Sequence, residues 1–200
     1  GLELRCLAHY MKSDNYTKEL LTGDIHTVNQ KLAGLKTRDK AKTFIYAFLY
    51  GAGAAKIGSI VGRDSSVGKT IKERFLENTP SLAKLKQKVG KASDKGYLKA
   101  LDGRHIRVRS EHAALNFLLQ SAGAIIAKRA WVIFHELATH LNYKQLGVIH
   151  DEIQIECSPD DAEEIGKLTV KAMELTTDYY KLGCPITGEY KIGRSWNETH

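Results

Sequence analysis

Four side chains that could bind a nucleotide recur at every fourth position between residues 38 and 50. They are Arg38, Lys42, Tyr46 and Tyr50, and this spacing places them along one slowly drifting stripe of a helix. Arginine and lysine neutralise phosphate oxygens, and the flat rings of tyrosine offer surfaces for a sugar or a base. The stripe therefore fits a nucleoside triphosphate. The alternative is a solvated basic face with two half-buried tyrosines.

A second polar stripe lies in an otherwise apolar stretch at 111–122. It consists of His112, Asn116 and Gln120. Uncharged side-chain amides suit the acceptor atoms N3 and O2, which every base pair presents in the minor groove of DNA. The stripe indicates contact with the minor groove of a duplex, although an ordinary amphipathic helix would also carry a polar face.

A third candidate is the apolar run "LGVIHDEIQIECS" at 146–158, which has acidic residues at its centre. In one continuous strand, Asp151 would share a face with Ile149 and Ile153 and point into the core, which is costly for a carboxylate. A tight turn at 150–152 avoids this cost, because it makes a β-hairpin that exposes Asp151. One carboxylate on a rigid hairpin suits Mg²⁺, which keeps several waters and substrate phosphates as ligands. The alternative is an acidic turn that binds nothing.

The elements that position these residues follow from hydrophobic periodicity and turn residues. Thr37 is a plausible N-cap for the helix that carries the first stripe, and the glycine-rich stretch after residue 50 ends that helix. A polar loop is expected after the first helix, with a turn-like "TGDIH" at 22–26. Helices are predicted at 2–11, 38–50, 66–89 (one or two, with Pro80 starting the second), 111–141 and 160–181, a short hairpin at 101–110, and strand structure at 146–157.

Composition limits the possible classes of protein. The chain has 200 residues, 42% of them hydrophobic, with a formal net charge of +7 and a pI of about 9.2. This mild basic bias favours a polyanionic partner. The three cysteines have no zinc-ligand spacing and predict neither a disulfide framework nor a zinc site. The longest apolar stretch is interrupted by polar residues, so no membrane span is expected, and no signal peptide is visible.

Four motifs in order along the whole chain resemble family A (pol I-like) DNA polymerases, specifically the phage replicative branch. "GLELRCLAHYM" is similar to the end of the first palm motif, and "RDKAKTFIYAFLYGAG" to the fingers motif. "HAALNFLLQSAGA" is similar to the minor-groove helix, and "VIHDEIQ" to the second palm motif. The resemblance implies an α+β fold: a palm with an antiparallel sheet and hairpin, and mainly helical fingers. It places the palm at 1–25 and 111–200 and the fingers at 26–110.

The resemblance also implies a role for each matching residue. Nucleotide (dNTP) binding is expected from Glu3, His26, Arg38, Lys42, Tyr46 and Tyr50, with Glu3 pairing with Tyr50 to exclude a ribose 2′-hydroxyl. DNA binding is expected from His112, Asn116, Gln120 and His150, of which His112 stands where many relatives carry arginine. Catalysis is expected from Asp151, Glu152 and Lys42, with Asp151 as the ligand of two Mg²⁺ ions.

The implied reaction is attack of a primer 3′-hydroxyl on the α-phosphate of a dNTP. One metal ion activates the hydroxyl and the other stabilises the leaving pyrophosphate. Tyr46 stands where the family carries Phe or Tyr, and a tyrosine hydroxyl there predicts acceptance of dideoxynucleotides by the complete enzyme. The Asp that begins the first palm motif would precede Gly1. A fragment without this Asp, the thumb and the exonuclease is expected to be inactive alone.

The implied partners are primer-template DNA, dNTPs and the upstream part of the polymerase. Location in the cytoplasm of a phage-infected bacterium is expected, and the sequence does not identify a processivity factor. Two alternatives remain: a non-catalytic DNA-binding remnant or split subunit, and a phage-type RNA polymerase. The latter fits less well, because its second palm motif usually reads His-Asp-Ser and it lacks an acid at the position of Glu3.

Overall fold

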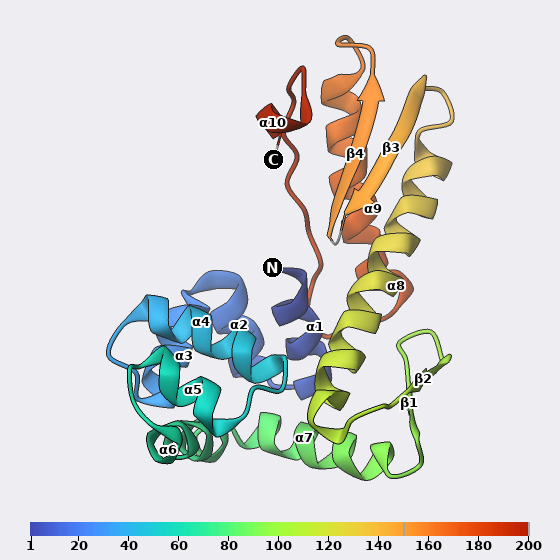
Figure 1. Ribbon diagram of the computed structural model, residues 1–200. Coiled ribbons are helices and arrows are strands. Elements are labelled where there is room, and N and C mark those ends of the chain that lie inside the picture. The colour runs from blue at the N-terminus through green and yellow to red at the C-terminus, as the bar shows by residue number, and fades with distance from the viewer. Residues whose placement is uncertain (150, 200) are drawn as a thin grey trace. The chain divides into compact units, whose positions relative to one another are not determined.

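The computed structural model describes residues 1–149 and 151–199 and shows an α+β chain (Figure 1). The chain forms two compact units. We call Leu7–Gln120 the central unit, and Gly1–Cys6 together with Ser121–His200 the terminal unit. The first helix, α1 (Leu2–Met11), and the long helix α8 (Ala114–Leu137) contribute residues to both units.

The central unit is mainly helical. Its further elements are α2 (Asp14–Thr22), α3 (Ile25–Ala33), α4 (Arg38–Leu49), α5 (Ala54–Ile60), α6 (Ser65–Glu77), α7 (Pro80–Ser93), β1 (Tyr97–Lys99), β2 (His105–Arg107) and the 3₁₀ turn η1 (Glu111–Ala113). Strands β1 and β2 pair antiparallel, with Leu98 opposite Ile106. The predicted helix break at Pro80 is confirmed. A short hairpin is present as predicted, but it spans 97–107 rather than 101–110, because its first strand precedes the Asp-Gly turn.

The core of the central unit fixes helix α4 by its apolar side. Phe44 and Phe48 of α4 meet Phe75 of α6 edge-on, with ring centroids 5.1 Å and 5.3 Å from that of Phe75. Helices α5 and α6 approach closely at Gly68, where a Cβ atom would overlap the backbone oxygen of Ala54. Because the apolar side of α4 is held in this core, its opposite side faces outward.

The expected polar loop after the first helix is wrong, because helices α2 and α3 occupy much of that segment. Each begins at a residue whose side chain accepts a backbone hydrogen bond, Ser13 for α2 and Asp24 for α3. Tyr16 and Ile25 are buried. These caps and this burial outweigh the polar composition of the segment.

The terminal unit contains the predicted hairpin. Strands β3 (Tyr143–Ile149) and β4 (Glu152–Cys157) pair antiparallel, with a register irregularity between Gln145 and Gly147. The remaining helices are α9 (Ala162–Tyr179) and the short α10 (Trp196–Thr199). Buried residues of α8 and α9, among them Phe134 and Ile165, form a core beside the partly buried Tyr143 and Ile155 of the hairpin. The hairpin is thus anchored at the end opposite its turn.

Two observations concern the segment around α8. The predicted helix start is wrong for His112, which lies in η1 before α8 begins at Ala114.

Among the described residues, the segment Glu111–Leu137 is long and apolar enough to cross a membrane by length and composition, and 44% of its 18-residue apolar stretch is buried. The core helix of a soluble protein passes the same test, so length and composition do not distinguish the two cases.

Candidate functional site

The predicted stripe on α4 lies on the side of the helix opposite its phenylalanine core. Thr37 caps the helix by accepting a hydrogen bond from the backbone N–H of Lys40, and Arg38 is the first helical residue. Lys42 is exposed and Tyr46 is half-buried. Tyr50 caps the C-terminal end with 53% of its surface exposed. The helix therefore presents two cations near its start and two aromatic residues toward its end.

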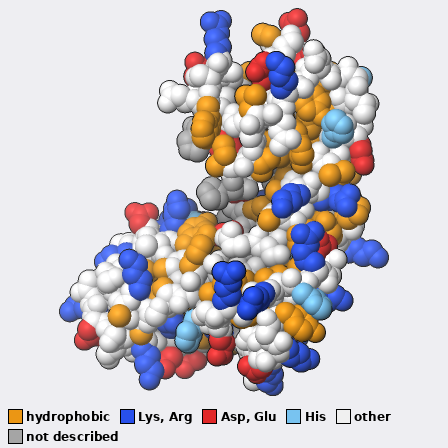
Figure 2. Space-filling view, turned by 45° about the vertical axis from the view of Figure 1, so that its right-hand side comes forward, with side chains coloured by type: hydrophobic (Ala, Val, Ile, Leu, Met, Phe, Trp, Pro, Cys, Tyr) orange, Lys and Arg blue, Asp and Glu red, His pale blue; other side chains and the backbone are white. Residues whose placement is uncertain are grey.

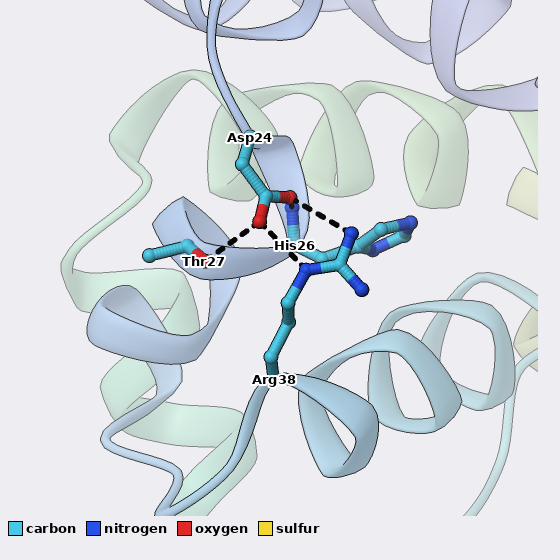
Figure 3. A network of polar contacts seen from close by, with 4 residues as sticks. All are labelled: Asp24, His26, Thr27 and Arg38. Carbon is cyan, nitrogen blue, oxygen red and sulfur yellow. Dashed lines mark hydrogen bonds and ion pairs between the residues drawn. The ribbon is translucent and has the colours of Figure 1, made fainter.

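Arg38 is held by a carboxylate that sequence reasoning did not single out. Figure 3 shows Asp24, the N-cap of α3, reaching the guanidinium group of Arg38. The Nε atom of Arg38 donates to Oδ2 of Asp24 at 2.6 Å, and an Nη atom donates to Oδ1 at 3.2 Å. The hydrogen bonds from Arg38 and then Thr27 hold the pKa of Asp24 well below its usual range. The only sequence signal for Asp24 is a helix-capping pattern, which predicts nothing about an arginine fourteen positions later.

His26 lies in the first turn of α3, and its ring is close to Tyr46. The two ring centroids are 6.4 Å apart. The Nδ1 atom of His26 is buried and has no hydrogen-bond partner within the described part of the chain. Burial first, and then the positive charge of Arg38, lower the pKa of His26. The ring of His26 thus lies beside Tyr46 of the α4 stripe, in surroundings that disfavour its protonated form.

The end of α4 contacts the helix that carries the second stripe. The side-chain amide of Gln120 donates a hydrogen bond to the hydroxyl of Tyr50 at 3.0 Å. Gly51 follows with φ +80°, and a Cβ atom there would overlap the backbone oxygen of His112. Asn116 is half-buried, whereas Gln120 and His112 are exposed. Two of the predicted stripes therefore meet at the C-terminal end of α4.

The hairpin presents Asp151 as predicted. Asp151 is exposed in the turn between β3 and β4. Its neighbour Glu152 begins β4, and one of its carboxylate oxygens accepts hydrogen bonds from Trp196 Nε1 at 2.9 Å and from the amide of Gln154. His150, predicted to bind DNA, lies outside the described residues. Glu3 belongs to the terminal unit and Tyr50 to the central unit, so their predicted pairing stays a prediction.

The side chains around Asp151 determine whether a metal ion could be bound by protein ligands alone. Within residues 1–149 and 151–199, no three side chains of His, Cys, Asp or Glu come together as a metal site. An exposed carboxylate is nevertheless a ligand that Mg²⁺ favours, and Mg²⁺ commonly binds one or two carboxylates together with water and substrate phosphates. Asp151 therefore fits as one protein ligand of a magnesium ion that is shared with a phosphorylated substrate.

The basic side chains on one face of the molecule do not gather in one place. Lys and Arg side chains are spread over the face shown in Figure 2 and do not form a single block there. Several of the charges are engaged locally, for example Arg104 with Asp102 and Lys144 with Glu156. The basic side chains on this face therefore do not by themselves mark a binding site.

Comparison with known proteins identifies the same family along nearly the whole chain. The family model of DNA polymerase family A matches residues 1–198. The chain is 43% identical to the DNA-directed DNA polymerase of Escherichia phage T7 and 43% identical to that of Enterobacteria phage T3, in each case over all of this chain and 32% of that protein. The DNA-directed DNA polymerase of Escherichia phage Phieco32 is 38% identical over all of this chain and 39% of that protein.

A solved structure shares the fold. It is the POL domain of Pol1 from M. smegmatis in complex with DNA primer-template and dNTP, with a TM-score of 0.79 and 22% sequence identity. The match covers 92% of this chain and 36% of that chain. The chain thus spans about a third of the length of the phage relatives it matches.

Proposed function

This chain belongs to DNA polymerase family A, and from that premise we propose that the protein is a template-directed DNA polymerase, which extends the 3′-hydroxyl of a DNA primer with deoxynucleotides. The phage relatives that it resembles along its whole length are named DNA-directed DNA polymerases. The observation that carries the proposal is the outward side of α4, where Arg38 and Lys42 lie on the same stripe as Tyr46, beside His26.

In this proposal the central unit binds the incoming dNTP. Arg38 and Lys42 neutralise the triphosphate, because a guanidinium fork and an ammonium group both pair well with phosphate oxygens. Lys42 also offsets the negative charge that develops as pyrophosphate leaves. His26 donates a hydrogen bond from Nε2–H to a phosphate oxygen, and Tyr46 and Tyr50 form the surface for the sugar and the base.

The DNA contacts come from the helix that starts at η1 and from the hairpin. We assign Asn116 and Gln120 to the minor groove of the new duplex, with His112 beside them and His150 near the primer end. Glu3 pairs with Tyr50 to exclude a ribose 2′-hydroxyl. We assign residues 26–110 to the fingers and residues 1–25 and 111–200 to the palm.

Asp151 is the proposed ligand of the two Mg²⁺ ions in the palm, with Glu152 as the neighbouring acid. Bound Mg²⁺ would supply Lewis acidity, which favours ionisation of the primer hydroxyl and neutralises the pyrophosphate. The contribution of the chain itself is to hold Asp151 in an exposed turn on an anchored hairpin and to fix the carboxylate of Glu152 through Trp196.

The test is single-nucleotide primer extension by the full-length protein with Mg²⁺. We expect template-directed incorporation, a lower rate with Lys42→Ala, and a much lower rate with Asp151→Asn. The matched control is Asp160→Asn, because Asp160 is another exposed aspartate of the terminal unit and should tolerate the change. DNA binding without any extension by the wild-type protein would instead favour a non-catalytic DNA-binding protein.

A further inference from the structure

The carboxylate of Asp24 connects the starts of two helices. Its Oδ1 atom accepts a hydrogen bond from the backbone N–H of His26 at 3.1 Å, and its Oδ2 atom accepts one from the hydroxyl of Thr27 at 2.8 Å. The same two oxygens accept the Nε and Nη hydrogen bonds of Arg38 (Figure 3). Because Asp24 caps α3 and Arg38 begins α4, one carboxylate fixes both helix starts.

The geometry of this contact determines which part of Arg38 remains available. A guanidinium group has five N–H donors in a rigid plane. Two of them, on the Nε side of the plane, point to Asp24, which leaves three on the Nη edge. A bidentate contact also defines the plane of the guanidinium, whereas a single hydrogen bond would let it rotate. Asp24 therefore orients Arg38 and leaves the edge that suits a phosphate.

Stability alone gives little reason for this pair. The side chains of Arg38 and Asp24 are 50% and 42% exposed, and exposed ion pairs contribute little to folding. Orientation is a different benefit, because a long arginine side chain loses rotamer freedom when it binds a ligand. An arginine that is already held in place loses less rotamer freedom when it binds the ligand.

We propose that Asp24 is a positioning residue for nucleotide binding: by holding the Nε side of Arg38, it directs the Nη edge toward the triphosphate of an incoming dNTP. The inference rests on the proposed function, in which Arg38 binds that triphosphate. Asp24 itself does not touch the nucleotide. Its carboxylate also sets the spacing of Arg38 on α4 from His26 on α3, two residues that face the same ligand.

A competing role makes the opposite prediction. If the carboxylate of Asp24 competed with phosphate for Arg38, its removal would strengthen nucleotide binding. If Asp24 positions Arg38, its removal weakens binding. The sign of the change in KM for the dNTP therefore separates the two roles.

The substitution Asp24→Asn tests the proposal in the full-length protein. Asparagine is as good an N-cap as aspartate, so α3 keeps its cap while the anionic partner of Arg38 is lost. We expect the KM for the dNTP in single-nucleotide incorporation to rise about three- to tenfold, the range set by immobilising one flexible side chain. We expect kcat to change less than about twofold, because the lost interaction stabilises bound substrate and transition state alike.

Two further variants separate positioning from a structural effect. Asp64→Asn is the matched control, because Asp64 caps α6 through the backbone N–H of Val67 at 3.1 Å and has no ion pair to an arginine among the described residues. It should leave KM unchanged. Arg38→Ala should raise KM by itself and should abolish the additional effect of Asp24→Asn, because an orienting residue has no role without the group that it orients.

The outcomes distinguish this inference from the proposed function. An unchanged or lower KM for Asp24→Asn, or an undiminished effect of Asp24→Asn in the Arg38→Ala background, overturns the positioning role while primer extension stands. Absence of primer extension by the wild-type protein, or no effect of Arg38→Ala on KM, overturns the proposed site of the triphosphate and the positioning role with it.

Discussion

Replacing Phe75 by leucine should loosen helix α4, which carries the proposed nucleotide-binding residues, although Phe75 itself lies on α6. Phe75 is fully buried on α6, where its ring meets Phe44 and Phe48 of α4 edge-on. Each such aromatic contact contributes about 1 kcal/mol beyond simple burial, so the loss of both costs about 2 kcal/mol. A leucine also fills the space with a different shape, which adds to this loss.

The assay is hydrogen exchange of the full-length protein, read by mass spectrometry on individual peptides. If opening of the central unit controls exchange, 2 kcal/mol corresponds to about 30-fold faster exchange of peptides from α4 and α6. Peptides from α9 serve as the internal reference, because α9 belongs to the terminal unit. Val67→Ala on the exposed surface of α6 is the matched control and should change exchange by less than about threefold.

Acceleration of less than about threefold in the α4 peptides of Phe75→Leu would refute this reasoning. Equal acceleration of the α9 peptides would refute it as well, because the effect would then be global. Support would consist of fast exchange confined to the central unit together with a raised KM for the dNTP.

Four further predictions concern other features of the chain. Gly68→Ala should destabilise the central unit by several kcal/mol, measured by urea unfolding, because the added methyl group meets backbone at the α5–α6 contact. Tyr46→Phe should reduce the use of dideoxynucleotides relative to deoxynucleotides in primer extension, and an unchanged ratio would contradict the proposed role of the hydroxyl. The buried Cys6, whose pKa is raised to about 12 mainly by burial, should react with a thiol reagent only on unfolding, whereas the half-buried Cys157 reacts earlier. Because the pKa of Asp24 is lowered in the folded state, the small stabilising effect of its ionised carboxylate is fully present above the ordinary pKa of 3.8 and is lost as the pH falls below that value. The small difference in stability between the wild-type protein and Asp24→Asn should therefore shrink as the pH is lowered below 3.8.

The parts of the fold that were predictable are those with a strong local pattern. The α4 helix has a cap, an apolar side and the start of a glycine-rich end within the fifteen residues 37–51, so its bounds and its exposed stripe could be derived from the sequence. The hairpin at 146–157 was predictable for a different reason, since the cost of burying Asp151 excluded a continuous strand. In both cases the deciding interactions lie between residues close together in the sequence.

The features that the sequence did not predict are two short helices, the start of α8 and one contact between helices. Helices α2 and α3 are short, and the polar composition of their segment obscured the capping residues and the few buried positions, such as Tyr16, that stabilise them. The start of α8 was misplaced because a short 3₁₀ turn at His112 continues the helical spacing without continuing the helix. The contact of Asp24 with Arg38 joins two helix starts, and an N-cap fully explains an aspartate at position 24 without it.

The residues proposed for the triphosphate and the proposed metal ligand Asp151 belong to different units, which has a consequence for how variants should behave. The residues assigned to the triphosphate depend on the packing of α4 in the central unit, and Asp151 depends on the anchored hairpin of the terminal unit. Substitutions that loosen α4 should raise the KM for the dNTP, because binding loses orientation before the chemical step is affected. Substitution of Asp151 should lower kcat instead, because the charge that develops in the transition state loses its stabilisation. Comparing Phe75→Leu with Asp151→Asn in one assay therefore tests whether binding and chemistry are separable in this protein.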